Sequence, residues 1–297
     1  MDIPPDSVFP TSAAASYGLS RNQLRGASFA HPFHGVVATG KLPDQMVMVK
    51  AALVAAGSDA LLGGLTALQM WGAWLPERFQ DARPIFVVIP PRRRGPRRTG
   101  IVVIRAQHVL PPVDIGDVWS VHPAQAWLQV AQLLDLTELT VLADFLMRRG
   151  SDLATRSDLE DVLVRSPRRS GVRRARAALE LARAGVESPM ESRLRLAIVD
   201  HGLPCPVVNH TVVVNYKEYR LDMAYVEALL GVEYDGRVHV QDRRQMEGDR
   251  TRRRQLEDAG WRVITVTSAD FQDLDPVFAS IRLALGSRGV SAWPMVH

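Results

Sequence analysis

Two short runs of residues, 219–225 and 230–235, constrain the fold of this chain more than any other part of it. Each run alternates apolar and polar residues and has the length of a β-strand. The pattern breaks near 226–228, where the chain would turn back. The two runs therefore predict a pair of neighbouring antiparallel strands.

The period of two residues assigns each side chain of this pair to one face of the sheet. In the second strand, Glu233 and Asp235 fall on one face. In the first strand, Asp222 shares a face with Arg220 and Ala224. The apolar residues expected on the opposite faces are Leu221, Met223, Tyr225, Val232 and Tyr234. Three carboxylates are thus expected to converge on one polar face.

Converging carboxylates predict a site for a hard divalent cation. Like charges at short distance resist ionising together unless a cation neutralises them, and oxygen ligands suit Mg²⁺ or Mn²⁺. Asp222 and Glu233 are the candidate metal ligands. Such an ion orients water and stabilises the charge that develops when a phosphodiester is cut. His239 is a candidate general base, general acid or further ligand.

This segment resembles the PD-(D/E)XK restriction-endonuclease-like superfamily, and most closely its very-short-patch-repair-like branch. Upstream, residues 187–196 resemble the opening helix of that branch, whose acidic residue is Glu191. Downstream, residues 263–267 resemble its last core strand. The resemblance implies that Glu191 joins Asp222 and Glu233 in the acidic set around the metal.

The resemblance covers about residues 185–287, and one position departs from the superfamily pattern. Asp235 stands where the superfamily has a lysine, two residues after the second acid. The branch also departs from lysine and places a histidine a little further on, where this chain has His239. The candidate catalytic residues are Glu191, Asp222, Glu233, Asp235 and His239. Function does not follow from the fold alone, since relatives also keep it as a binding platform.

Each of these residues also has a purely structural interpretation. The strand acids are also explained as charges at a solvent-facing strand edge. Glu191 is spaced to pair with Arg195 at i, i+4 on one helix, and Asp249 with Arg252 at i, i+3. His239 is equally interpretable as a solvated surface histidine.

The basic residues suggest contact with nucleic acid. Of the 36, only Lys41, Lys50 and Lys217 are lysines, and the planar fork of arginine suits phosphate and guanine edges. One cluster lies between the apolar runs 85–89 and 101–104, which predicts a β-hairpin with a basic loop. The loop residues expected to contact DNA are Arg92, Arg93, Arg94, Arg97 and Arg98. A solvated loop without that role is the alternative.

The N-terminal residues have the capping and turn pattern typical of a helix-turn-helix. Helices are expected over 11–17 and 21–25, and a wing over 29–39. The side chains suited to a major groove are Arg21, Asn22, Gln23 and Arg25. The segment resembles the winged-helix domain of AbiEi-type antitoxins. That resemblance implies an antitoxin and autorepressor that partners a nucleotidyltransferase-like toxin. A small helical cap without a DNA role is the alternative.

The chain is long enough for several domains, and an α/β (α+β) fold is expected. The expected order is a winged helix-turn-helix at 1–44, an α/β middle region at 45–164, a basic linker at 165–184, and a restriction-endonuclease-like mixed sheet flanked by helices at 185–297. In the middle region, the aromatic residues expected to anchor the core are Trp71, Trp74, Trp119 and Trp127.

Several other classes of protein do not match the sequence. No apolar run is long enough to span a membrane, and the N-terminus lacks a signal pattern. The lone Cys205 rules out an internal disulfide, so a cytoplasmic location is expected. The chain has neither a glycine-rich phosphate loop with its lysine nor Cys/His zinc spacing.

Three functional hypotheses follow. The first is a DNA-binding regulator of the AbiEi type, with double-stranded DNA and a cognate toxin as partners and no cofactor needed for DNA binding. The second is a Mg²⁺-dependent or Mn²⁺-dependent DNA endonuclease. The third is a scaffold whose basic patches meet an acidic protein.

Overall fold

The computed structural model describes residues 3–40, 44–80, 84–107, 110–151, 153–236 and 243–291. The chain forms two compact units. The first unit consists of Met1–Glu138 with Leu153–Arg176, and the second of Leu139–Asp152 with Ala177–His297. Sheets and helices occur in both units, which confirms the expected α+β class.

The N-terminal part of the first unit is a three-stranded antiparallel sheet with strand order β1-β3-β2. Its elements are β1 (Val8–Pro10), the 3-10 helices η1 (Thr11–Tyr17) and η2 (Gln23–Arg25), β2 (Phe29–Ala30) and β3 (Val36–Thr39). Phe9, Ala14, Leu24 and Val37 form its small core.

The second helix of the expected helix-turn-helix does not form. Residues 21–25 contain only the 3-10 turn η2, which ends at Gly26. Gln23 accepts hydrogen bonds from both the backbone N–H and the hydroxyl of Ser20, each at 2.8 Å. Side chains that bond locally in this way compete with helix formation. A major-groove recognition helix is therefore not part of the structure at residues 3–40.

The rest of the first unit is a five-stranded mixed sheet with strand order β6-β5-β4-β8-β7. Its strands are β4 (Leu61–Leu62), β5 (Ile85–Ile89), β6 (Ile101–Arg105), β7 (Val113–Ile115) and β8 (Val118–Ser120). Its helices are α1 (Gln45–Ala56), α2 (Gly64–Met70), α3 (Glu77–Gln80), α4 (Pro123–Val130) and α6 (Arg156–Arg165).

The predicted hairpin at β5 and β6 is wrong, because these strands run parallel, from Ile85↔Ile101 to Ile89↔Arg105. Parallel neighbours require the chain to return to its starting end, so the basic segment 90–100 is a crossover and not a tight turn. An apolar run predicts a strand but not its direction.

Of the tryptophans expected in the core, Trp127 is fully buried, whereas Trp119 is 55% exposed. Trp119 lies on β8, at a position whose neighbours Val118 and Ser120 are both buried. Because strand residues alternate, Trp119 points away from the core. The prediction that Trp119 anchors the core is therefore wrong.

The second unit contains a four-stranded mixed sheet with strand order β12-β11-β10-β9. Its strands are β9 (Val207–Val214), β10 (Lys217–Tyr225), β11 (Leu230–Asp235) and β12 (Arg262–Thr267). The helices are α8 (Pro189–Asp200), α9 (Arg243–Asp258) and α10 (Asp275–Ser287), with the 3-10 turns η3 (Val226–Ala228) and η4 (Asp270–Gln272). The predicted antiparallel pair is confirmed as β10 and β11, and β12 adds in parallel.

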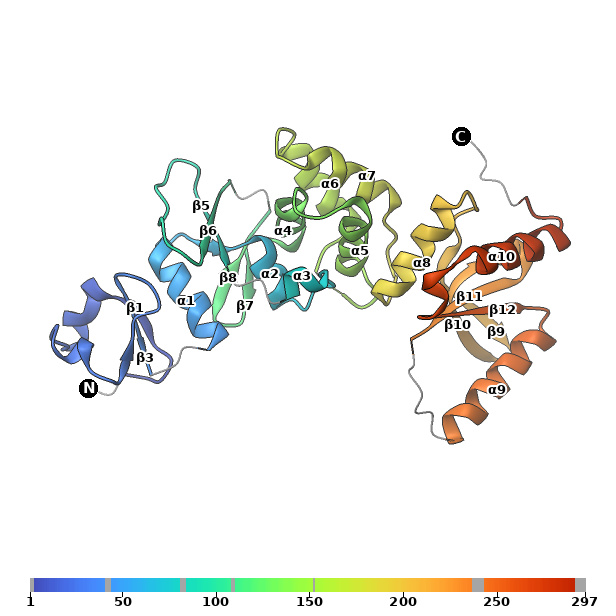
Figure 1. The fold of residues 1–297 in the computed structure, drawn as a ribbon, viewed down its shortest axis with the longest axis horizontal. Helices are drawn as coiled ribbons and strands as arrows, with labels where there is room; N and C mark the ends of the chain where they lie inside the picture. Colours follow the sequence, from blue (N-terminus) through green and yellow to red (C-terminus); the bar gives the residue numbers. More distant parts are fainter. Residues whose placement is uncertain are drawn as a thin grey trace. The chain divides into compact units, whose positions relative to one another are not determined.

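The helices of the second unit cover both faces of its sheet (Figure 1). One core joins α8 and α10 to the sheet through Leu194, Ile281 and Val232. The other joins α9 to the opposite face through Leu256 and Leu221. Apolar side chains on both faces make this sheet the middle layer of three.

Two helices, α5 (Leu136–Leu146) and α7 (Val172–Leu181), cross the division between the units. The basic segment 165–184, expected as a linker, contains the helix α7. Within the described ranges, no helix has both the length and the hydropathy needed to cross a membrane.

Candidate carboxylate site

Asp222 lies where the ladder between β10 and β11 stops. The pairing runs from Tyr225↔Leu230 to Met223↔Val232 and ends there. The carboxylate of Asp222 then accepts the backbone N–H of Tyr234 at 2.9 Å. Strand N–H groups point along the plane of a sheet, so this carboxylate lies between the strands and not on a face.

The strict alternation predicted for β10 fails at this point. Leu221 and Ala224 both pack on the α9 face, whereas Met223 and Tyr225 pack on the α8 and α10 face. The neighbouring strand is also irregular here, because Asn209 has φ 49° and its pairing is skipped between Leu221↔His210 and Met223↔Val208. The local break, common beside functional sites, turns Asp222 away from the position that simple counting gives.

Glu233 lies on the α9 side of β11, where it meets Arg252. The guanidinium donates to both carboxylate oxygens of Glu233, with Nη1 to Oε2 at 2.9 Å. Its Nη2 also donates to the backbone carbonyl of Arg220 at 2.7 Å. A bidentate arginine fixes the orientation of a carboxylate and neutralises its charge. The partner predicted for Arg252 from helix spacing was Asp249, whose side chain lies outside the described residues.

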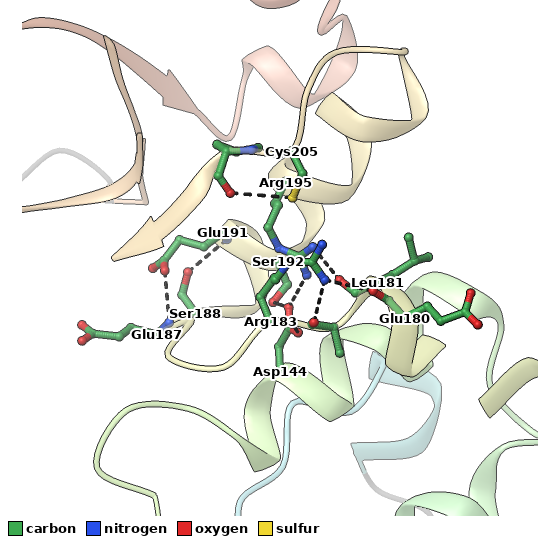
Figure 2. A network of polar contacts seen from close by, with 12 residues as sticks. Asp144, Glu180, Leu181, Arg183, Glu187, Ser188, Glu191, Ser192, Arg195 and Cys205 are labelled. Carbon is green, nitrogen blue, oxygen red and sulfur yellow. Dashed lines mark hydrogen bonds and ion pairs between the residues drawn. The ribbon is translucent and has the colours of Figure 1, made fainter. Parts of the chain in front are cut away.

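Glu191 is held in the first turn of α8. Ser188 caps this helix by accepting the Glu191 N–H at 3.1 Å, and the Glu191 carboxylate accepts the Glu187 N–H at 3.1 Å (Figure 2). This is close to a capping box. The alternative pairing of Glu191 with Arg195 is wrong, because the guanidinium of Arg195 turns to Asp144.

Asp144 and Arg195 form a buried ion pair beneath α8 (Figure 2). Their side chains are 0% and 1% exposed and meet at 2.7 Å. Asp144 also accepts the Ser192 hydroxyl and the Arg183 N–H, each at 2.7 Å. Arg195 Nε has no hydrogen-bond partner among the described residues, but the ion pair and the bonds to Asp144 tie α8 to α5 and so hold the helix that carries Glu191.

The three acids Glu191, Asp222 and Glu233 act on one another electrostatically. The pKa of Asp222 is raised to about 7, by burial first and then by the charges of Glu191 and Glu233, against the lowering effects of the Tyr234 N–H and Arg252. A carboxylic acid with a pKa near 7 exchanges its proton at neutral pH. Acids on α8 and β11 are thus near enough to Asp222 on β10 to raise its pKa.

The remaining predicted residues are placed less centrally. Asp235 ends β11 on the same face as Glu233 and pairs in register with Thr267. It is not among the charges that perturb Asp222. His239 lies outside the described residues. Within the part of the chain that the structure describes, no three His, Cys, Asp or Glu residues are grouped closely enough to hold a metal ion.

The predicted DNA-contacting residues lie in the first unit. The side chains of Arg21, Asn22, Gln23 and Arg25 are exposed around η2. In the basic crossover, Arg92, Arg94 and Arg97 are exposed. Arg93 is committed to an ion pair with Asp59, and Arg98 is half-buried. Three of the five loop arginines are therefore accessible to phosphates.

Comparisons with known proteins leave the function open. No protein-family model matches the chain. It is 30% identical over 148 residues to uncharacterized protein MT2308 of Mycobacterium tuberculosis (strain CDC 1551 / Oshkosh), and equally to uncharacterized protein Rv2248 of strain ATCC 25618 / H37Rv. The match covers 50% of this chain and 55% of each relative, so the chain spans about half the length of these curated relatives.

Two solved structures are weakly similar to parts of the chain. The homing endonuclease I-Bth0305I catalytic domain has a TM-score of 0.27 and 19% identity, over 33% of this chain and 94% of that domain. The Rv2827c protein from Mycobacterium tuberculosis has a TM-score of 0.38 and 15% identity, over 72% of this chain and 85% of that protein. At these TM-scores neither likeness indicates a function.

Proposed function

We propose that this protein binds double-stranded DNA and cleaves its phosphodiester bonds at the site formed by Glu191, Asp222 and Glu233. The observation that carries the proposal is the burial of Asp222 against two further acids, which raises its pKa to about 7. A buried acid with acidic neighbours destabilises the fold when it is ionised. Such an arrangement is typical of a site that takes up a cation or a proton during its work.

No three potential ligands are grouped among the described residues, but a hard divalent ion can be held by only one or two carboxylates of the protein. Asp222 and Glu233 would hold Mg²⁺ or Mn²⁺, since Mg²⁺ in proteins is often held by one or two carboxylates with water and substrate phosphate. When bound, the ion would stabilise the negative charge that develops on the phosphate oxygens. Glu191 adds a third negative charge that favours the cation, and Arg252 orients Glu233. His239 remains the candidate for proton transfer.

Exposed arginines of the first unit would bind the phosphate backbone of the DNA. Arg92, Arg94 and Arg97 project from the crossover between β5 and β6. Arginine binds phosphate oxygens in a bidentate manner, and such contacts position a protein on DNA without reading its sequence. The exposed side chains around η2 would add to this surface, without a recognition helix.

The proposal is tested by incubating the full chain with supercoiled plasmid in Mg²⁺, Mn²⁺ or EDTA. Asp222→Asn should abolish metal-dependent nicking and leave the fold intact, because an amide oxygen can still accept the Tyr234 N–H. Glu227→Gln is the matched control, since Glu227 is an exposed acid in the turn between the same two strands. Equal nicking by wild type and Asp222→Asn would dismiss the assignment.

A second function is favoured by the pairing of Arg252 with Glu233. Because an arginine already neutralises this acid, the domain also suits a platform that binds DNA without cutting it. The protein would then be an autoregulator or antitoxin of the AbiEi type, with a nucleotidyltransferase-like toxin as partner. Repression of a reporter by the protein at its own promoter, unaffected by Asp222→Asn, would favour this function over cleavage.

A further inference from the structure

A cavity of about 780 Å³ lies in the first unit, far in sequence from the acidic site. The end of β6, one side of α4 and the segment after α6 line it. Cavities that hold small molecules in proteins measure about 300–1,000 Å³. The size therefore fits an organic ligand with several polar groups.

The charged residues that line the cavity are all basic. Three arginines, Arg105, Arg165 and Arg169, contribute to the wall, and Arg165 also pairs with Asp161 outside it at 3.8 Å. No acidic residue is among the residues that line the cavity, all of which lie within the described ranges. Positive charge without lining carboxylates attracts anions.

Gln129 and Arg169 are the two lining residues whose donors matter most. Gln129 is 4% exposed, and its Nε2 group donates to no described atom while its Oε1 accepts the Gly64 N–H at 2.7 Å. Arg169 is half-buried, burial lowers the pKa of its guanidinium, and no carboxylate opposes that shift. Buried donors are normally satisfied, so the unpaired Gln129 Nε2 points to an acceptor that the described residues do not supply.

The glutamines on α4 explain how the sequence builds this wall. Gln125, Gln129 and Gln132 are spaced i, i+4 and i+7, which puts them on one side of a helical path. The neighbouring positions of α4 are apolar and buried. The chain thus keeps amides on the one side of α4 where aliphatic residues would otherwise complete the core.

We propose that this cavity binds a small phosphorylated molecule, with the phosphate at Arg169 and an acceptor atom of the ligand at Gln129 Nε2. Arginine is the side chain best suited to phosphate, and amide donors suit a sugar or base oxygen. The phosphates of a DNA duplex lie on the outside of a wide double helix. They cannot reach Gln129, because this residue is buried. The site is independent of the cleavage proposed for the second unit.

The experiment is isothermal titration calorimetry of the full chain with AMP, inorganic phosphate, adenosine and a short DNA duplex. Arg169→Gln should weaken AMP binding at least tenfold, which corresponds to about 1.4 kcal/mol. Arg168→Gln is the control, because Arg168 is an exposed neighbour that does not line the cavity. The Arg168→Gln variant should bind AMP with an affinity within about twofold of the wild-type value. Inorganic phosphate should compete with AMP, and adenosine should bind more weakly than AMP.

Four results would overturn the proposal. They are the absence of saturable binding by AMP and phosphate, equal effects of the two arginine variants, adenosine binding as tightly as AMP, and an Arg169→Gln effect confined to the duplex. If Arg169→Gln does not fold, Gln132→Glu replaces it. Gln132 is exposed at the cavity wall, so a carboxylate there should repel AMP without disturbing the core. Unchanged AMP affinity in Gln132→Glu would count against the site.

Discussion

Replacing Asp222 with asparagine should make the second unit more stable at high pH while removing its proposed activity. The pKa of Asp222 is about 7 in the folded protein and 3.8 in an unperturbed chain. Because the folded-state value is the higher one, ionisation favours the unfolded state. The stability contributed by this group is complete below about pH 4 and is lost as the pH rises through 7.

The size of the effect follows from the two pKa values. At pH 8 the ionised Asp222 should cost about 4 kcal/mol of unfolding free energy, and at pH 5 about 1.5 kcal/mol. Asparagine does not titrate and retains an acceptor for the Tyr234 N–H. Between pH 5 and pH 8 the stability difference should therefore shift in favour of Asp222→Asn by about 2.5 kcal/mol.

The assay is urea unfolding of both proteins at the two pH values, followed by hydrogen exchange of peptides from β10 and β11. These peptides report on the second unit alone. Other groups titrate in both proteins and cancel in the difference. Glu227→Gln, in the exposed turn, should show a pH-dependent difference below about 0.5 kcal/mol. A difference for Asp222→Asn that does not change with pH would refute the account of this site.

Three further predictions concern other residues. Asp144→Asn should destabilise the second unit by about 3–5 kcal/mol in urea unfolding, because it leaves a buried arginine without its carboxylate. Arg252→Gln should raise the pKa of Asp222 further, measured by carbon NMR of its carboxyl group, since Arg252 now lowers that value. Changing Arg92, Arg94 and Arg97 together to alanine should reduce the slope of log affinity for DNA against log salt by up to about 2.7, measured by fluorescence anisotropy.

The strand pair in the second unit was predictable because its side chains obey a period of two. The positions of Glu233 and Asp235 on one face follow from that period. The local break at Asp222 does not, because it depends on a hydrogen bond to Tyr234 and on the conformation of Asn209. A local break of this kind depends on contacts with the neighbouring strands and leaves no periodic signal.

Elements whose arrangement depends on distant contacts were harder to predict. The apolar runs of β5 and β6 indicated strands, yet their parallel direction follows from the rest of the sheet. The 3-10 turn at Gln23–Arg25 forms where a helix was expected, because local side-chain bonds decide it. The ion pair of Arg252 with Glu233 joins α9 to β11, a contact between separate elements that helix spacing alone does not reveal.

Two features did leave a signal in the sequence. Asp144 is a lone acid in the otherwise apolar run 141–146, and such a residue usually marks a buried partner. The glutamines of α4 repeat at helical spacing among apolar residues. Both patterns indicate polar groups held inside the protein, but neither identifies what they contact.

The most direct test of the central claim uses one end-labelled DNA duplex. The full chain is incubated with it in Mn²⁺ or EDTA, and each sample is run on a native and on a denaturing gel. The account predicts a shifted duplex under both conditions and cut strands in Mn²⁺ alone, with cutting lost in the Asp222→Asn/Glu233→Gln variant. A shifted duplex whose strands stay intact under both conditions, or equal cutting by the variant, would contradict it.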